Sequence, residues 1–434
     1  MSNQTLERQT VERHTQLATH LRYVAANSPY YQDLWRNAFS RVDTPLTALP
    51  VTDLDTYWAA NTPTDNRVLT APHMDGPVFK SGGTTGNPKF SFYSNDDWRH
   101  MCETFGAAMR RGGLRAGERV ANLFYGGQLY ASFLFIGRAI EQAGCGVQFP
   151  LSGSAPAEEV IKTIQQFRIE TLACLPTTML ALLPEIEAAE PGSIPLRRVL
   201  YGGEAIFDDQ IEALHRVLPH CAVQSVGIAG VDYGELGWSE PGTEQGVHRM
   251  FDDSTVLELL DERGEPIDEP GVAGELVITN FKRRLMPVVR YPVGDRGIWV
   301  DTPGTPARRF RVLGRSNNCA RIGPVSLYAE DVHAVLRKVP YHGFINFQMV
   351  VEHSEHRDRC TLRIAVARPQ AVPDTVKSAI VTALHAERPL IADVTAQNVI
   401  HPLAIEWVTP QQLIVNERTG KTLHVIDRRL ELNA

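Results

Sequence analysis

The residue types best suited to binding an anion are concentrated between Lys80 and Phe90, where three glycines stand among hydroxyl side chains and a lysine follows. Glycine lets several backbone N–H groups point at one position and lets an anion approach closely. The candidate ligands in this stretch are Ser81, Gly82, Gly83, Thr84, Thr85, Gly86 and Lys89. Together they suit a polyphosphate, although the spacing is not that of a Walker A loop. An ordinary flexible surface loop is the alternative interpretation.

Three carboxylates and a second lysine lie elsewhere at positions that a nucleotide site could use. Asp295 follows a glycine turn and could accept hydrogen bonds from both hydroxyls of a ribose. Glu204 and Asp232 each follow a predicted strand and could hold a magnesium ion together with substrate phosphates. Lys421 lies in a polar segment late in the sequence. The alternatives are an ordinary turn residue for Asp295, helix capping for Glu204 and Asp232, and a solvated side chain for Lys421.

Two other kinds of site find little support in the sequence. His353, His356 and Cys360 have a spacing typical of metal ligands, but no clear fourth ligand accompanies them, so a zinc site is disfavoured. No Gly-x-Ser-x-Gly sequence occurs, which argues against a serine hydrolase. The six cysteines form no C-x-x-C pair, which favours free thiols in a reducing compartment over a disulfide framework.

The composition is that of an ordinary globular protein, with 43% apolar and 21% charged residues in a chain of 434. The net charge of −7 argues against a nucleic acid or an anionic membrane as partner. The first twenty residues are too polar for a signal peptide, and no apolar run approaches the length of a membrane span. We therefore expect a cytoplasmic protein with room for two domains.

The elements that must position the candidate residues form an α/β pattern. Between residues 120 and 226, short apolar strands alternate with helical periods, which predicts right-handed crossovers and a largely parallel sheet. Ligands bind beyond the carboxyl ends of such strands, where residues 201–204 and 227–232 fall. The predicted strands are 78–80, 121–124, 146–149, 171–175, 196–200 and 222–226, and the predicted helices are 4–26, 95–111, 129–143, 154–167 (with Ser154 as cap), 178–189 and 208–218.

The domain organisation follows from two changes of pattern. After residue 246 short β-strands predominate, and beyond residue 316 a smaller mixed pattern begins. We predict a large N-terminal domain of parallel and mixed sheets with helices, residues 1–316, and a small α+β domain, residues 317–434. The strand at 78–80 should lead into the glycine-rich loop and the helix at 95–111 should leave it, a crossing common at phosphate sites.

In their order and spacing these segments resemble the adenylate-forming (ANL) superfamily of acyl-CoA synthetases, luciferases and peptide-synthetase adenylation domains, and most of all its phenylacetate–CoA ligase branch. The resemblance covers nearly the whole chain. The segments that carry it are 28–31 (Ser-Pro-Tyr-Tyr), 81–89, 149–153 (Phe-Pro-Leu-Ser-Gly), 175–177 (Leu-Pro-Thr), 202–204 (Gly-Gly-Glu), 291–295 (Tyr-Pro-Val-Gly-Asp), 314–315 (Gly-Arg), 419–421 (Thr-Gly-Lys) and 425–429 (Val-Ile-Asp-Arg-Arg). Their order and distances make the resemblance specific.

The resemblance implies an enzyme that uses ATP and magnesium, in which a carboxylate attacks the α-phosphate and yields an acyl-adenylate and pyrophosphate. Lys421 would bridge the carboxylate and the α-phosphate, Asp295 would bind the ribose with help from Arg315, and the glycine-rich loop would hold the β- and γ-phosphates. The remaining nucleotide contacts would come from Gly203, Glu204, Ile228 and Ala229. Catalysis would then rest on positioning and charge neutralisation. In most relatives the small domain rotates afterwards, and a thiol of CoA or of a carrier protein takes the acyl group.

The acyl pocket implied by the resemblance is mostly aromatic, with glycine gaps. Its candidate lining residues are Tyr125, Gly126, Gly127, Tyr130, Phe133, Tyr201 and Ala229. Aromatic walls favour a flat aryl acid over a long acyl chain. Simple core packing is the alternative for several of these aromatics, above all Phe133.

The sequence departs from the family pattern at two places. The family's Tyr-Gly-x-Thr-Glu motif has two registers here: residues 228–232, which put Asp232 at the magnesium-side acid, and residues 233–237, which keep Tyr-Gly but lose the acid. We favour the first register. At the hinge, Asn317 stands where the family usually has aspartate, and Pro324 (or, one residue slipped, Gly323) stands at the glycine near the thiol tunnel.

Three functions are compatible with these residues. The first is ATP-dependent adenylation of an aromatic acid followed by transfer to CoA. The second is adenylation in a specialised pathway, such as phenazine-type antibiotic assembly, with the acyl group passed to a carrier protein, an amine or a reductase. The third is a nucleotide-binding homologue that has lost turnover. A homodimer is compatible with each.

Overall fold

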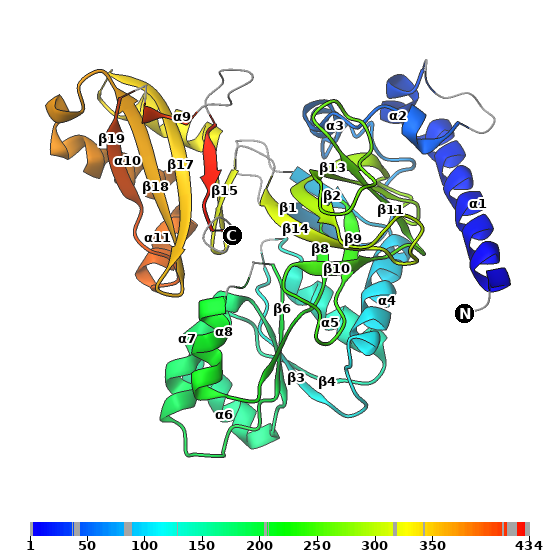
Figure 1. Cartoon of the computed structure of the whole chain (residues 1–434), viewed down its shortest axis with the longest axis horizontal. Coiled ribbons are helices and arrows are strands. Elements are labelled where there is room, and N and C mark those ends of the chain that lie inside the picture. The colour runs from blue at the N-terminus through cyan, green and yellow to red at the C-terminus, as the bar shows by residue number, and fades with distance from the viewer. Residues whose placement is uncertain are drawn as a thin grey trace.

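The computed structural model describes residues 3–36, 38, 44–81, 89–127, 129–203, 206, 208–315, 319–341, 343–409, 412–414 and 423–429. Two parts with separate sheets lie side by side (Figure 1). The larger part extends to Arg315 and holds a five-stranded parallel sheet, a seven-stranded antiparallel sheet and a two-stranded antiparallel sheet. The smaller part begins at Cys319 and holds a four-stranded mixed sheet and a two-stranded hairpin. Within these ranges, no helix is both long and apolar enough to span a membrane.

A five-stranded parallel sheet organises the lower half of the larger part in Figure 1. Its strand order is β4 (Val147–Pro150), β3 (Arg119–Asn122), β5 (Thr171–Cys174), β6 (Arg198–Tyr201) and β7 (Ala222–Ser225). The helices that cover it are α4 (Asn95–Arg111) and α5 (Ser132–Ala143) on one face, and α6 (Ala157–Phe167), α7 (Pro176–Ala188) and α8 (Asp208–Val217) on the other. Alternate residues of β5 face these two cores, because successive side chains of a strand point to opposite faces. The predicted parallel α/β unit is confirmed.

Helix α4 shows how local chemistry sets the bounds of an element. The side chain of Ser94 accepts a hydrogen bond from the backbone N–H of Asp97, so it caps the first turn. Arg110 and Arg111 occupy the last turn, where positive charge stabilises the helix dipole. The prediction of Ser154 as the cap of α6 is wrong: that helix begins after Pro156, and the Ser154 hydroxyl lies 3.0 Å from the Ser152 hydroxyl in the preceding turn.

A seven-stranded antiparallel sheet forms the other half of the larger part. Its strand order is β11 (Thr255–Leu260), β12 (Ala273–Asn280), β13 (Val288–Trp299), β14 (Arg309–Arg315), β10 (Val247–Met250), β9 (Gly234–Trp238) and β8 (Ile228–Gly230). The N-terminal elements α1 (Asn3–Asn27), α2 (Pro29–Leu34), η1 (Leu46–Ala48) and α3 (Leu54–Ala60) contribute to its hydrophobic core. The antiparallel pattern therefore starts at Ile228, earlier than the predicted residue 246, because β8 and β9 are too short and glycine-rich to read as strands.

The smaller part has a hydrophobic core of its own. Its hairpin consists of β15 (Cys319–Ile322) and β16 (Val325–Tyr328). Its sheet has the order β19 (Ala404–Val408), β18 (Arg357–Val366), β17 (Phe344–Ser354) and β20 (Val425–Asp427), and its helices are α9 (Ala329–Lys338), η2 (Pro369–Ala371), α10 (Asp374–Glu387) and α11 (Pro389–Ala396). This agrees with the α+β fold class predicted for this region.

Candidate active site

The parallel sheet brings several predicted site residues to one edge. Strands β3, β5, β6 and β7 run in the same direction, so the segments that follow them emerge together. Gly126 and Gly127 follow β3, Gly203 follows β6, and Ile228 follows β7. Gly203 has a φ of 78°, a left-handed conformation that glycine adopts without strain. The edge is therefore built from glycine-containing loops whose backbones a ligand could approach closely.

The glycine-rich loop joins two antiparallel strands, β1 (Val78–Ser81) and β2 (Lys89–Phe92), in which Ser81 pairs with Lys89. Residues 82–88, and with them Gly82, Gly83, Thr84, Thr85 and Gly86, lie outside the described part of the chain. The predicted strand–loop–helix crossing is wrong in one respect. Strand β2 separates the loop from α4, so the N-terminus of that helix does not receive the loop directly.

The pairing of β13 with β14 places Asp295 opposite Arg315. Directly opposed residues of an antiparallel pair have neighbouring Cβ atoms, so the two residues predicted to serve the ribose start from adjacent positions. Asp295 is half-buried and follows Gly294, which has a φ of 79°. Two segments separated by twenty residues in the sequence thus meet at one place.

Asp232 lies in the turn between β8 and β9, and its side chain is half-buried. The hydroxyl of Tyr291 donates a hydrogen bond to Asp232 Oδ2 over 2.8 Å. Burial, together with the nearby Asp232 charge, raises the pKa of Tyr291 well above its usual value, so the phenol stays a donor at any ordinary pH. One oxygen of Asp232 is therefore oriented by the core of the protein.

Lys89 Nζ lies 5.4 Å from the centroid of the Trp58 ring, a cation–π distance. Trp58 packs edge-on against Tyr57, and Tyr57 packs in the same way against Tyr291. This chain of rings connects the lysine at the base of the glycine-rich loop with the tyrosine that orients Asp232. Trp58 escaped the sequence prediction because an aromatic residue in a short helix looks like ordinary core.

Arg283 is a second contributor that the sequence did not reveal. Its side chain is only 3% exposed, and its guanidinium lies over the Tyr93 ring at 4.1 Å. Arg283 Nη1 and the Tyr93 hydroxyl both donate to the carbonyl of Val231, over 3.1 and 2.8 Å. In the described part of the chain no carboxylate forms an ion pair with this guanidinium. The buried guanidinium and the phenol hydroxyl thus hold the carbonyl of Val231, and with it the turn that carries Asp232, in place.

Glu235 belongs to the second register of the Tyr-Gly motif, and it points into the interior. Its side chain is almost fully buried and accepts a hydrogen bond from Asn280 Nδ2 over 3.0 Å. His100 Nε2 lies 3.8 Å from its other oxygen. A ligand in an open site would reach the half-buried Asp232 more easily, which favours the register in which Asp232 replaces the family's glutamate.

The candidate acyl residues divide into two groups. Tyr125 and Tyr130 are 37% and 45% exposed, so their rings are available to a ligand. Tyr201 is only 7% exposed and packs in the core beneath α6 and α7, where burial raises its pKa to about 12. This position favours a packing role for Tyr201. Ala229 is half-buried beside the core between the sheet and α4, and Phe133 lies against Gly126.

Some predicted residues lie where the structure gives no account of their side chains. Glu204 and Lys421 are outside the described ranges, and only the backbones of Ser81 and Arg315 are described. Within the described residues, no cluster of three histidine, cysteine or acidic side chains could hold a metal ion. His353, from the metal-like spacing, instead places its Nδ1 2.9 Å from Asp358 Oδ1, and Cys360 is fully buried.

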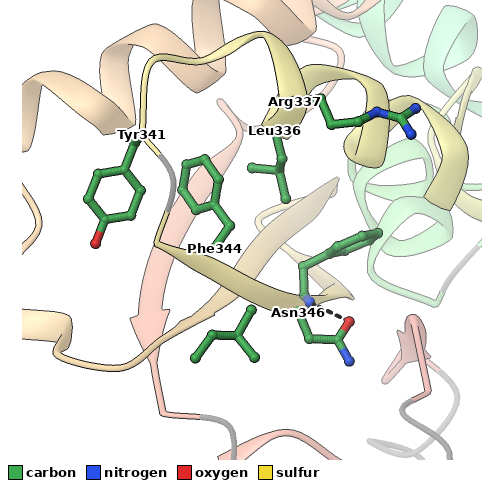
Figure 2. A pocket seen from close by; sticks show the side chains of 7 residues that line it. Leu336, Arg337, Tyr341, Phe344 and Asn346 are labelled. Carbon is green, nitrogen blue, oxygen red and sulfur yellow. Dashed lines mark hydrogen bonds between the residues drawn. The ribbon is translucent and has the colours of Figure 1, made fainter.

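A hollow of about 310 Å³ lies in the smaller part, where α9 leads into β17 (Figure 2). Tyr341 and Phe344 line it with rings 4.9 Å apart, and Arg337 and Asn346 lie at its side. None of the predicted site residues belongs to it. The hollow is therefore separate from the edge of the parallel sheet described above.

Comparison with solved structures defines the class of protein to which this fold belongs. The fold is similar to that of 2-hydroxyisobutyryl-CoA ligase solved with 2-HIB-AMP and CoA in the thioesterification state, with a TM-score of 0.75 and 19% identity over 98% of this chain and 92% of that one. The TM-score to the postadenylation state of the same ligase is 0.63. The protein thus has the fold of adenylate-forming CoA ligases.

Relatives in sequence narrow the class to a family. Phenylacetate–coenzyme A ligase of Thermus thermophilus is 30% identical over 371 residues, which cover 81% of this chain and 80% of the relative. Fumarate–(S)-2,3-diaminopropanoate ligase of Enterobacter agglomerans is 23% identical over 91% of this chain and 95% of the relative. No protein-family model matches the sequence. The chain belongs to the phenylacetate–CoA ligase family of adenylate-forming enzymes.

Proposed function

We propose that this protein uses ATP to activate an aromatic carboxylic acid as an acyl-adenylate and then transfers the acyl group to CoA. The observation that carries the proposal is the opposition of Asp295 and Arg315 across β13 and β14, in a chain of the phenylacetate–CoA ligase family. A carboxylate at this position can accept hydrogen bonds from both ribose hydroxyls. Arg315 belongs to the motif that opens the hinge, so the nucleotide would lie next to the joint between the two parts.

The phosphates would lie between the glycine-rich loop and the β8–β9 turn. Lys89 supplies positive charge at the base of that loop, and Ser81 to Gly86 supply backbone and hydroxyl donors. Asp232 fits a magnesium ion that travels with ATP, because one of its oxygens accepts no hydrogen bond from the described residues while Tyr291 orients the other. Magnesium would neutralise phosphate charge, and Glu204 is the second candidate ligand.

Residues 317–434 would form a small mobile domain that carries Lys421 to the α-phosphate and to the acid. The hydrophobic cores support this division, because the core of the smaller part shares no residue with those of the larger part. Lys421 would neutralise the charge that develops as the acid's carboxylate oxygen attacks phosphorus and pyrophosphate leaves.

Free cysteines, most of them buried, support a reducing, cytoplasmic location.

The acid would bind against the exposed rings of Tyr125 and Tyr130, with Gly126, Gly127 and Ala229 leaving room for a flat ring. Phenylacetate is the first substrate to test, since the relative that shares 30% identity is a phenylacetate ligase.

A second candidate differs only in the acceptor. The similarity to fumarate–(S)-2,3-diaminopropanoate ligase extends over almost the full length of both chains, and the name of that enzyme pairs a carboxylic acid with a compound that carries amino groups. In the register that puts Pro324, and not Gly323, at the place of the family's glycine near the thiol tunnel, the proline also favours an acceptor other than CoA. This function would suit a specialised pathway, such as antibiotic assembly, in which an amine or a carrier-protein thiol receives the acyl group.

ATP–pyrophosphate exchange over a panel of aryl acids tests the first step. We expect exchange with at least one arylacetic or benzoic acid, and a CoA thioester once CoA is added. Exchange without a thioester, followed by amide formation with added amines, would select the second candidate. Measurable ATP binding with no exchange for any acid would leave only a nucleotide-binding protein without turnover.

A further inference from the structure

A buried glutamine of the smaller part joins the two segments that flank Lys421 in the sequence. Gln348, on β17, is 0% exposed, and its Nε2 donates to the carbonyl of Ile414 over 2.6 Å and to the carbonyl of Leu423 over 2.8 Å. Its Oε1 accepts a hydrogen bond from the N–H of Ile414 over 3.0 Å. Residues 415–422, which include Lys421, lie outside the described part of the chain, and Gln348 bonds the described residue on either side of them.

The orientation of the Gln348 amide follows from its partners. Ile414 presents both its N–H and its carbonyl to this side chain, and the N–H can bond only to Oε1. Both hydrogens of Nε2 then have a carbonyl as acceptor. Rotating the amide would break three hydrogen bonds to the backbone, so the side chain has one favourable orientation.

Backbone hydrogen bonds reinforce the same junction. The N–H of Leu423 donates to the carbonyl of Ile414 over 3.1 Å, and the N–H of Met349 donates to the carbonyl of His424 over 2.8 Å. Strand β20 then pairs in parallel with β17. The chain therefore joins the sheet directly after Leu423, and Gln348 bonds it at the point where it does so.

The bonds at this junction require an amide. The side chain of glutamine carries the donor and the acceptor of a peptide group, so it connects Ile414 and Leu423 as a strand would. A glutamate at position 348 would keep the acceptor and lose the amide donor. A methionine, which has a similar size, would remove all three bonds and leave buried backbone groups without this partner.

We propose that Gln348 is a positioning residue for adenylation, which holds the two ends of the segment that carries Lys421 at a fixed separation on the smaller part. The inference rests on the proposed function, in which Lys421 bridges the acid and the α-phosphate. A segment with fixed ends samples fewer conformations than one with free ends, so less entropy is lost when its lysine reaches the reacting groups. Gln348 thereby acts on the rate of adenylation and not on the affinity for ATP.

Gln348 itself touches none of the reacting atoms. In adenylation an oxygen of the acid bonds to the α-phosphorus, the bond from that phosphorus to the bridging oxygen breaks, and pyrophosphate leaves with the electron pair. No proton needs to move. Lys421 neutralises the charge on the oxygens, and Gln348 acts through Ile414 and Leu423.

The test compares the two half-reactions in Gln348→Met, Gln348→Glu and a matched control. The control is Ile364→Val, which shortens a fully buried side chain in the core of the smaller part and removes no hydrogen bond. ATP–pyrophosphate exchange reports adenylation, and synthetic aryl-adenylate supplied with CoA reports transfer. For Gln348→Met we expect exchange to slow about tenfold, with transfer and the Kd for ATP both within about twofold of wild type.

Gln348→Glu keeps the folded protein available if the methionine variant does not fold, since it retains the bond from Ile414. We expect the same selective loss of exchange, because the two carbonyls lose their amide donor. For Ile364→Val we expect exchange and transfer at wild-type rates.

A further readout does not depend on activity. Hydrogen–deuterium exchange of the peptides that contain Ile414 and Leu423 reports how often the junction opens. We expect both Gln348 variants to exchange these amides faster than wild type, and Ile364→Val to leave them unchanged.

The opposite outcomes overturn the proposal. Wild-type pyrophosphate exchange in both Gln348 variants would do so, as would an equal loss of exchange and transfer, which indicates a merely structural role, or the same selective loss in Ile364→Val. If the wild-type protein adenylates no acid, the proposed function fails by itself. Deuterium exchange then decides alone, and unchanged protection of Ile414 and Leu423 in the Gln348 variants would exclude the positioning role.

Discussion

Replacing Tyr291 with phenylalanine should weaken the use of Mg·ATP while leaving the fold intact. The substitution removes one hydroxyl, which donates to Asp232 Oδ2 over 2.8 Å, and leaves the ring packed against Tyr57. A hydrogen bond to a charged group contributes roughly 1.5–3 kcal/mol. If that energy orients Asp232 toward magnesium, kcat/KM for adenylation falls by a factor of about 10 to 100, since about 1.4 kcal/mol corresponds to a factor of ten. The free energy of unfolding should fall by only about 1 kcal/mol, because the substitution removes the buried hydroxyl itself and leaves no unpaired donor on the ring.

The matched control is Tyr57→Phe, which removes a hydroxyl from the same core. Tyr57 is also fully buried, but its hydroxyl donates over 3.1 Å to the carbonyl of Pro287 and not to a carboxylate. The assay is ATP–pyrophosphate exchange titrated with magnesium, with thermal unfolding of both variants alongside. We expect a shifted magnesium dependence for Tyr291→Phe alone. If both variants show the wild-type dependence, or if both lose activity in proportion to stability, the assignment of Asp232 to the metal is refuted.

Three further predictions concern other residues. Lys421→Ala should abolish adenylation while ATP affinity in equilibrium binding stays nearly unchanged; an unimpaired exchange rate would exclude the bridging role. Asp295→Ala should weaken ATP binding by about 1–3 kcal/mol, the cost of leaving polar partners unpaired, as measured by calorimetry. Burial alone would raise the pKa of Asp358, but the His353 hydrogen bond and the Arg429 charge hold it below its ordinary value of 3.8. Because the folded-state pKa is lowered, this stabilisation is present above about pH 4 and is lost as the pH falls through the folded-state pKa. Asp358→Asn should lower the free energy of unfolding by about 3 kcal/mol at pH 7 in a denaturant titration, and a stability equal to wild type would contradict the pairing.

The sequence predicted best what depends on local pattern. Helix α4 has its predicted bounds, because a serine cap, acidic residues in the first turn and basic residues in the last all lie within the helix or next to it. The parallel strands were found because apolar runs between helices are a local signal. The short strands β8 and β9 were missed, since their glycines weaken strand propensity and only the pairing with neighbours stabilises them.

The sequence does not predict the contacts that shape the site, because the residues that form each contact are far apart in the sequence. Tyr291 and Asp232 are 59 residues apart, and Arg283 and Tyr93 are 190 apart. No periodicity within a helix or strand connects such residues. Sequence reasoning reached Asp232 and Asp295 because acids at strand ends have a recognisable chemistry, and it missed Trp58 and Arg283 because buried aromatic and basic side chains support a site without touching the ligand.

The β8–β9 turn explains how this chain could keep a working site with altered residues in a family motif. In the favoured register Val231 stands where the family has a threonine hydroxyl, and its side chain packs against the core between the sheet and α4. What fixes the turn is the carbonyl of Val231, which accepts hydrogen bonds from Tyr93 and Arg283 whatever side chain the residue carries. The position of Asp232 therefore does not depend on the lost hydroxyl. A substitution at residue 231 that keeps the volume of the side chain should therefore leave Asp232 in place, so the altered motif is compatible with an active enzyme.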